Sequence, residues 1–183
     1  MSNDQRATPP WQTLRLPIAA MAAVIVLSNW TVQYPINAWL TWGAFTYPLV
    51  FLVCDLTNRA LGPAAARRVA WAGFAVAVAI SGLLAPWRIA LASGTAFIVS
   101  QLLDVLVFNR WRRATWWKAP LIGSQVASVV DTGVFFFLAF AGSGLNWLQL
   151  AGGDLAVKAA MAVLLLAPYR ALLPRLQTWA PAR

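Results

Sequence analysis

The sequence predicts an all-α integral membrane protein with six transmembrane helices and both termini in the cytoplasm. Three features predict this fold class: an apolar composition, a series of long apolar runs, and an uneven distribution of basic residues. Of the 183 residues, 61% are hydrophobic and 10% are charged, whereas a soluble domain is about 45–50% apolar and about 25% charged. Because so small a chain cannot bury this excess in a globular core, we expect lipid to be its solvent.

The apolar runs divide the chain into a tail and a membrane domain. Residues 1–15 are polar and form the predicted cytoplasmic tail, and residues 16–178 form the predicted six-helix domain. Each run is long enough for the roughly 20 residues that cross a bilayer as a helix. Little more than Pro86 and Trp87 separates the third run from the fourth, which predicts a tight helical hairpin. The predicted spans are residues 16–35, 41–60, 68–86, 88–110, 117–141 and 152–174.

Basic residues predict the orientation, because Lys and Arg are concentrated in the cytoplasmic loops of membrane proteins. Only Arg88 lies in a loop on the opposite side, and Lys158 lies within the sixth run. With six spans, the other twelve share one side, which is therefore the predicted cytoplasmic side: Arg6, Arg15, Arg59, Arg67, Arg68, Arg110, Arg112, Arg113, Lys118, Arg170, Arg175 and Arg183.

Several classes of function are not expected from this composition. The net charge is +9, but the basic residues punctuate apolar runs instead of forming a soluble basic face, which argues against nucleic-acid binding. The chain has no His and a single cysteine, Cys54, so neither a metal site nor a disulfide framework is predicted. No phosphate-binding loop or Ser/His/Asp set is present. We therefore expect no cofactor and no enzymatic activity.

Ionisable residues at bilayer depth are candidates for function, because a charge in lipid is costly and must face the bundle interior. Asp131 lies near the middle of the fifth run, and Lys158 is placed about one turn inside the outer end of the sixth. Amide side chains of the first and fourth runs reach a similar depth. Together these groups predict a substrate pocket open to the outside, formed by Asn29, Gln33, Gln101, Asp131 and Lys158.

A structural interpretation of the same residues stays open. Asp131 can simply neutralise Lys158, while the amides bond to backbone groups of neighbouring helices. Asp154, four residues before Lys158, is assigned a structural or coupling role. Asp55, Arg59 and Asp104 receive the same assignment near the cytoplasmic ends of their helices. Asp55 and Arg59 stand at i,i+4, the spacing of an ion pair on one helix face, and the two aspartates are alternatively a proton-carrying pair.

Several motifs resemble those of the queuosine-precursor transporters in the vitamin uptake transporter family, over roughly residues 20 to 170. The sequence departs from that pattern in the short connection between the third and fourth runs and in Ser128, where an Asn is expected. The matching segments are Ser28-Asn29-Trp30-Thr31-Val32-Gln33-Tyr34-Pro35, Trp42-Gly43-Ala44-Phe45 through Asp55-Leu56-Thr57-Asn58-Arg59, Gln101-Leu102-Leu103-Asp104 through Phe108-Asn109-Arg110, Trp116-Trp117-Lys118-Ala119-Pro120, Asp131-Thr132 with Phe135-Phe136-Phe137, and Asp154 with Lys158.

This resemblance implies an importer of 7-deazaguanine bases, such as the 7-cyano and 7-aminomethyl precursors of queuosine, in the bacterial inner membrane. It also implies a fold like that of the substrate-binding (S) components of energy-coupling-factor transporters. A guanine-like edge offers paired N–H donors that the Asp131 carboxylate can accept, and its face can stack on an aromatic ring. The candidate rings are Trp30, Phe135 and Trp147.

Two modes of action follow from the resemblance. In the first, the chain transports its substrate alone. In the second, it is a substrate-binding subunit for a small vitamin-like molecule that docks on a separate ATPase module, for which Ala19 and Ala23 offer a small-residue face on the first span. The expected partners are a purine-like base and membrane lipid, and a homo-oligomer is left open.

Overall fold

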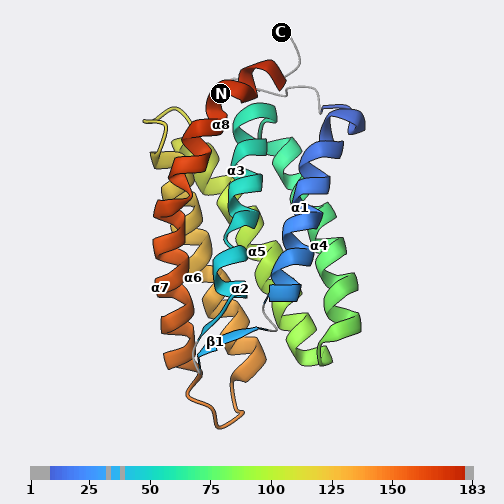
Figure 1. Ribbon diagram of the computed structural model, residues 1–183, viewed down its shortest axis with the longest axis vertical. Helices are drawn as coiled ribbons and strands as arrows, with labels where there is room; N and C mark the ends of the chain where they lie inside the picture. Colours follow the sequence, from blue (N-terminus) through green and yellow to red (C-terminus); the bar gives the residue numbers. More distant parts are fainter. Residues whose placement is uncertain (1–8, 32–33, 38–39, 180–183) are drawn as a thin grey trace.

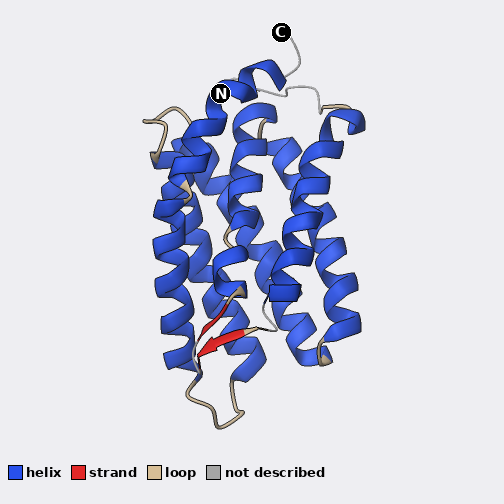
Figure 2. Ribbon diagram, viewed as in Figure 1, coloured by secondary structure: helices blue, strands red, loops and turns tan. Residues whose placement is uncertain are grey.

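The computed structural model describes residues 9–31, 34–37 and 40–179, and most of them are helical (Figure 1). The long helices run side by side along one axis of the molecule. A short hairpin lies at one end, where β1 (Pro35–Asn37) pairs antiparallel with β2 (Leu40–Thr41) (Figure 2). The helices are α1 (Trp11–Thr31), α2 (Gly43–Thr46), α3 (Leu49–Leu61), α4 (Pro63–Leu84), α5 (Trp87–Trp111), α6 (Lys118–Phe140), α7 (Trp147–Leu164) and α8 (Leu166–Trp179).

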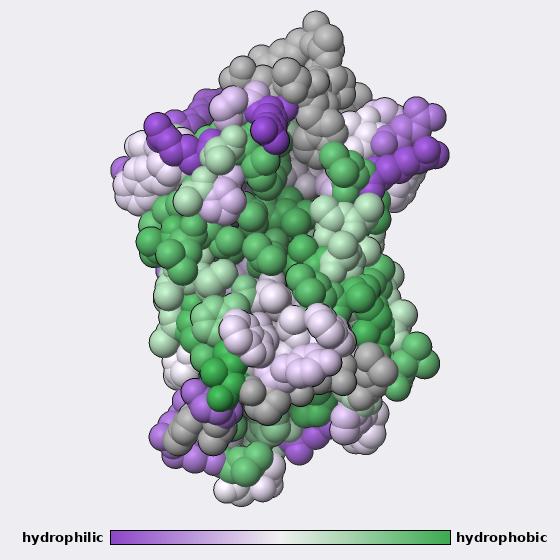
Figure 3. Space-filling model, viewed as in Figure 1, coloured by the Kyte–Doolittle hydropathy of each residue, from purple (hydrophilic) through white to green (hydrophobic). Residues whose placement is uncertain are grey.

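The prediction of an all-α membrane protein is confirmed. Five helices of the described part are long and apolar enough to cross a bilayer, namely α1, α4, α5, α6 and α7. Large apolar side chains project outward from them, with Leu83 85% exposed and Leu106 61% exposed. Figure 3 shows a hydrophobic band across the middle of the visible face, with hydrophilic residues toward the two ends. Such a surface suits hydrocarbon and not water, so the protein is a multi-pass membrane protein.

The second predicted span, residues 41–60, consists of two helices with Tyr47 and Pro48 between them. Pro48 has no N–H to donate to the preceding turn. The backbone tightens there, with Val50 N–H donating to Tyr47 O at 3.0 Å and Phe51 N–H donating to Pro48 O at 3.1 Å. At 13 residues, α3 is too short to be counted among the five apolar spans. This junction places the Tyr47 hydroxyl deep in the bundle.

The sixth predicted span, residues 152–174, differs from the structure at both ends. Helix α7 begins earlier, at Trp147, and ends at Leu164, after which α8 continues from Leu166. Pro168 lacks the N–H that an unbroken helix would donate to Leu164. Because α7 begins at Trp147, Lys158 lies about three turns from the beginning of the helix instead of one. The hairpin between α4 and α5 is as tight as predicted, since only Ala85 and Pro86 join them.

Helix α5 lies at the centre of the bundle, in contact with α3, α4 and α6. Its Phe97 packs in the main apolar core with Met21 and Ile25 of α1. Gly73 of α4 permits this close packing, because a Cβ there would lie 2.7 Å from Met21 Cγ. A second buried cluster, formed by Phe108, Ala119 and Tyr169, fixes α8 against the ends of α5 and α6.

The basic helix ends gather at the end of the bundle opposite the hairpin. Arg68 of α4 lies over the ring of Trp11, 5.3 Å from its centroid, and Arg170 of α8 lies 4.7 Å from the centroid of Trp116. Figure 1 shows α8 and the beginning of α1 at this same end. At the other end, Arg88 donates hydrogen bonds to backbone carbonyls near the end of α6. The structure therefore separates most basic residues from the hairpin end, as charge counting predicts.

Candidate functional site

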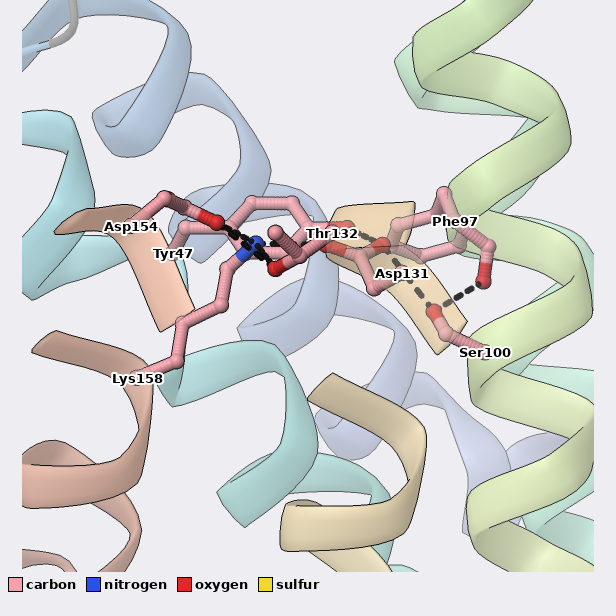
Figure 4. Close-up of polar contacts among 7 residues, drawn as sticks. All are labelled: Tyr47, Phe97, Ser100, Asp131, Thr132, Asp154 and Lys158. Carbon is pink, nitrogen blue, oxygen red and sulfur yellow. Dashed lines mark hydrogen bonds and ion pairs between the residues drawn. The ribbon is translucent and has the colours of Figure 1, made fainter. Parts of the chain in front are cut away.

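Asp131 is the centre of a buried polar network (Figure 4). The side chain lies on α6 and the residue is 3% exposed. Its Oδ1 accepts a hydrogen bond from the Tyr47 hydroxyl at 3.0 Å and lies 3.1 Å from the Ser100 hydroxyl, which is equally close to the Phe97 carbonyl. Its Oδ2 accepts a hydrogen bond from Lys158 Nζ at 2.7 Å. Three segments of the chain thus converge on one carboxylate.

The Lys158 ammonium lies between two carboxylates. Its Nζ is 2.7 Å from Asp131 Oδ2 and 2.5 Å from Asp154 Oδ2, and it also donates to Thr132 Oγ1 at 3.1 Å. These contacts use all three donors of an ammonium group. Thr132 in turn donates to Asp154 at 2.8 Å, and the Tyr47 ring lies 5.3 Å below the ammonium. With two carboxylates and one ammonium, the cluster carries a formal excess of negative charge.

The cluster lies deep in the membrane domain. Asp131 is about two and a half turns before the end of α6, and Lys158 is about three turns after the beginning of α7. Both residues therefore lie roughly 15 Å along their helices from the end of the bundle where the β1–β2 hairpin lies. A bilayer core is about 30 Å thick. Charged residues at that depth mark substrate or ion pathways in membrane proteins. The corrected beginning of α7 is what brings Lys158 level with Asp131.

The structure forms the ion pair of the structural interpretation, in which Asp131 neutralises Lys158. Of the remaining residues proposed for the pocket, the structure describes Asn29 and Gln101. Asn29 donates to the Ile25 carbonyl of its own helix at 2.9 Å. Gln101 is fully buried, and neither of its amide atoms has a hydrogen-bond partner among the described residues. Gln33 lies outside the residues that the structure describes.

Sequence reasoning missed Tyr47 and Ser100 as partners of Asp131. Tyr47 precedes Pro48, and this dipeptide was a detectable signal that the second span is interrupted and can turn a side chain inward. Ser100 is fully buried, but a single Ser in an apolar helix gives no such signal. Of the candidate stacking rings, Trp30 is 56% exposed and meets Tyr34, Phe135 meets Phe136 and Phe140, and Trp147 meets Phe137.

Asp55 and Asp104 form a second buried group closer to the basic end. Their side chains come from α3 and α5, and the residues are 2% and 0% exposed. The predicted ion pair between Asp55 and Arg59 is wrong. Arg59 instead donates to the Tyr169 hydroxyl at 2.9 Å and to the Arg112 carbonyl at 2.9 Å. Those contacts join α3 to α8 and to the end of α5.

A bundle of apolar spanning helices with charged residues at mid-depth defines a membrane protein of the transport class. Comparison of the sequence with known families gives the same class. The family model described as "Putative vitamin uptake transporter" matches residues 41–86 and 81–172. This match covers more than half of the chain, so the protein belongs to the vitamin uptake transporter family.

Relatives within this family carry transporter names. The "Queuosine precursor transporter" of Escherichia coli (strain K12) is 36% identical over 174 residues, and 79% of each chain is covered. The "Probable queuosine precursor transporter" of Haemophilus influenzae is 33% identical over 186 residues, again with 79% of each chain covered. That of Bacillus subtilis (strain 168) is 30% identical over 132 residues, which cover 56% of this chain. No solved structure shows a significant match. The protein is therefore a transporter-family member and not an enzyme.

Proposed function

We propose that this protein imports queuosine precursors, the 7-deazaguanine bases that include the 7-cyano and 7-aminomethyl forms, across the bacterial inner membrane. The observation that carries the proposal is the relationship to the Escherichia coli queuosine precursor transporter, at 36% identity over 79% of each chain. The buried cluster around Asp131 supports it, because hydrogen-bonding and charged groups at mid-membrane depth suit a polar heterocycle that has to leave water.

The proposed topology has six crossings with both termini in the cytoplasm. The consecutive helices α2 and α3 supply the second crossing beside the five apolar spans. The basic end, where α3 meets α4 and α5 meets α6, is then the cytoplasmic side, and the hairpin end faces outward. Six helices in this order suit the fold of the S components of energy-coupling-factor transporters.

Asp131 is the proposed acceptor for the N–H donors of the guanine-like edge. A carboxylate offers two oxygens with about four lone-pair sites, so it can accept a pair of N–H groups side by side. Lys158 has to release Asp131 for this to happen. It keeps Asp154 as a counter-ion at 2.5 Å when it does so, which avoids the high cost of an unpaired buried ammonium. Asn29, Gln33, Gln101 and the released Lys158 are the proposed partners for the other polar atoms of the base.

Complementation tests this proposal. A bacterial strain that cannot make queuosine precursors and lacks its own importer is supplied with a low concentration of a 7-deazaguanine base. Expression of this chain is expected to restore queuosine in tRNA, whereas an empty vector and Asp131→Asn at equal expression are not. Absence of queuosine with well-expressed wild-type protein would contradict the proposal. Recovery only with a co-expressed ATPase module would assign the chain as a substrate-binding subunit.

A further inference from the structure

Two carboxylic acids meet inside the bundle without a cation between them. The carboxyl groups of Asp55 of α3 and Asp104 of α5 are both buried and lie close enough to share a hydrogen. Neither oxygen of Asp104 accepts a hydrogen bond from an N–H or O–H group of the described residues, and Asp55 accepts only one long bond, 3.4 Å from the Ser124 hydroxyl. Two ionised carboxylates have no hydrogen to share. The two groups can therefore form a hydrogen bond with each other only when one of the acids is protonated.

The charged and titratable groups around the pair do not neutralise it in place of a bound proton. The Cys54 thiol lies beside Asp104, and a thiol is a weak donor with no charge of its own. The charge of Arg59 acts on Asp55, but Arg59 donates to Tyr169 and to a backbone carbonyl, and no ion pair joins it to Asp55 among the described residues. Lys158 is held in the Asp131 network. Two buried like charges in contact repel strongly, so the doubly ionised pair is disfavoured here.

The helices leave room for this contact, and a small pocket lies beside it. Gly123 of α6 faces Asp104, and a Cβ there would lie 2.6 Å from Asp104 Oδ1. On its other side, Asp55 lines a small pocket together with Ser124 of α6 and Tyr169 of α8. Because α8 lies at the basic end of the bundle (Figure 1), the Tyr169 wall of this pocket is on the side proposed to be cytoplasmic.

The same helices carry both buried groups. On α5, Ser100 contacts Asp131, and Asp104 follows one turn later. On α6, the buried Ser124 contacts Asp55, and the buried Ser128 lies between Ser124 and Asp131; hydroxyl groups can both accept and donate a proton. Protonation of the pair therefore changes the charge on helices that also position the proposed substrate site.

We infer that Asp55 and Asp104 form a shared-proton site that couples import to the proton gradient. This inference rests on the proposed transport function. One carboxylate accepts a proton from water while the site faces outward, and the new O–H group donates to the other carboxyl. On the cytoplasmic side the O–H bond breaks and the proton passes to water in the pocket. The substrate moves without covalent change, and the proton is the second solute carried.

The protonated acid can be observed directly by infrared spectroscopy of purified protein. Its C=O stretch is distinct from that of a carboxylate and shifts in D2O. The sequence has only five acidic side chains, all of them Asp, so assignment by single substitutions is practical. We expect one such band at neutral pH, shifted in frequency in Asp104→Asn and in Asp55→Asn, lost in the double variant, and unchanged in Asp131→Asn. Absence of the band in the wild-type protein, or its survival in the double variant, would overturn the inference.

Transport by proteoliposomes supplies the second measurement. An inward gradient of one pH unit supports about tenfold substrate accumulation for each proton carried, at zero membrane potential. We expect the wild-type protein to accumulate the base under this gradient. The double variant Asp55→Asn/Asp104→Asn is expected to lose accumulation and retain exchange of internal for external substrate, which also shows that it is folded. Gradient-driven accumulation by that variant would contradict the inference, as would wild-type transport that ignores the gradient.

The two measurements separate this inference from the transport proposal. If the wild-type protein neither binds nor exchanges 7-deazaguanine bases, the proposed function fails whatever the infrared band shows. If it exchanges them but shows no gradient-driven accumulation, only the coupling role of the pair fails. A double variant that does not purify as a monodisperse protein is replaced by the single Asp→Asn variants, whose accumulation is then compared with their exchange.

Discussion

Lys158 of α7 lies 2.7 Å from Asp131 of α6 and 2.5 Å from Asp154, one turn earlier on its own helix. One ammonium is therefore paired with two carboxylates, of which Asp131 also has Tyr47 and Ser100 as hydrogen-bond partners and Asp154 also accepts a hydrogen bond from Thr132. This arrangement lets Asp131 exchange its cation for a ligand while Lys158 stays paired. An ion pair that has only a structural role does not need a second carboxylate beside the ammonium. Asp154 therefore supports the proposal that Lys158 can leave Asp131 when a ligand binds.

Replacement of Asp131 by Asn tests its role as substrate acceptor. The variant keeps the size of the side chain but presents an N–H donor toward the donor edge of the base. Because a charge-assisted hydrogen bond contributes about 1.5–3 kcal/mol, affinity is expected to fall roughly ten- to a hundred-fold. Binding of a 7-deazaguanine base to purified, monodisperse protein measures this change.

The same variant also reports on stability. Removing one partner of a lone buried ion pair costs about 3–5 kcal/mol, but Lys158 retains Asp154. We therefore expect Asp131→Asn to remain folded in detergent. Normal binding by the folded variant would remove Asp131 from the site. Aggregation that is relieved only when Lys158 is also neutralised would show that the pair is mainly structural.

Replacement of Lys158 by Met is expected to have the larger effect on stability. It keeps a long side chain but leaves the carboxylates of Asp131 and Asp154 facing each other without a cation, at a cost of about 3–5 kcal/mol. The midpoint of thermal aggregation in detergent measures the loss. Adding Asp154→Asn removes one of the like charges and should recover part of it. Equal aggregation midpoints for the single and double variants would contradict the charge argument.

Tyr47→Phe isolates the contribution of the Tyr47 hydroxyl. The ring and its position under Lys158 are kept, while the 3.0 Å hydrogen bond to Asp131 is lost. A hydrogen bond to a charged group contributes about 1.5–3 kcal/mol. Substrate affinity is therefore expected to change by roughly tenfold or more in a protein that purifies like the wild type. An unchanged dissociation constant would mean that Tyr47 supports the fold and not the site.

Much of the membrane fold could be predicted from local patterns, and the remainder depended on contacts between helices. Long apolar runs indicated α1, α4, α5 and α6, and the basic residues indicated which helix ends lie together. The depth of Lys158 was misplaced because the predicted span began at residue 152, whereas α7 begins at Trp147 and passes through Gly152 and Gly153. Likewise the i,i+4 spacing favoured an ion pair of Asp55 with Arg59, but Tyr169 on a distant helix offers Arg59 a better-placed acceptor.

The proposed topology can be tested with reporter fusions at the helix connections. Fusions after residues 65 and 114 are expected to report the cytoplasm, because these positions lie at the basic end of the bundle. Fusions near residues 87 and 147 are expected to report the outside, because the α4 to α5 and α6 to α7 connections lie at the hairpin end (Figure 1). A cytoplasmic signal near residue 147 would exclude the six-crossing arrangement.

Two glycines of α6 provide a matched test of the contact between α5 and α6. In Gly123→Ala the new methyl group would lie 2.6 Å from Asp104 Oδ1, whereas in Gly133→Ala nothing lies within 4 Å of it. Overpacking costs about 1–3 kcal/mol, and Ala in an open helix position is about 0.5–1 kcal/mol better than Gly. We therefore expect Gly123→Ala to lower the aggregation midpoint and Gly133→Ala to leave it unchanged or raise it.

Gly123→Ala should also disturb the carboxyl pair, because Asp104 has to rotate away from the added methyl group and so away from its present contact with Asp55. Gradient-driven accumulation is then expected to fall further than substrate exchange, while Gly133→Ala keeps the wild-type ratio of the two. If Gly123→Ala proved as stable and as well coupled as Gly133→Ala, Asp104 would not occupy the position next to Gly123 that the shared proton requires.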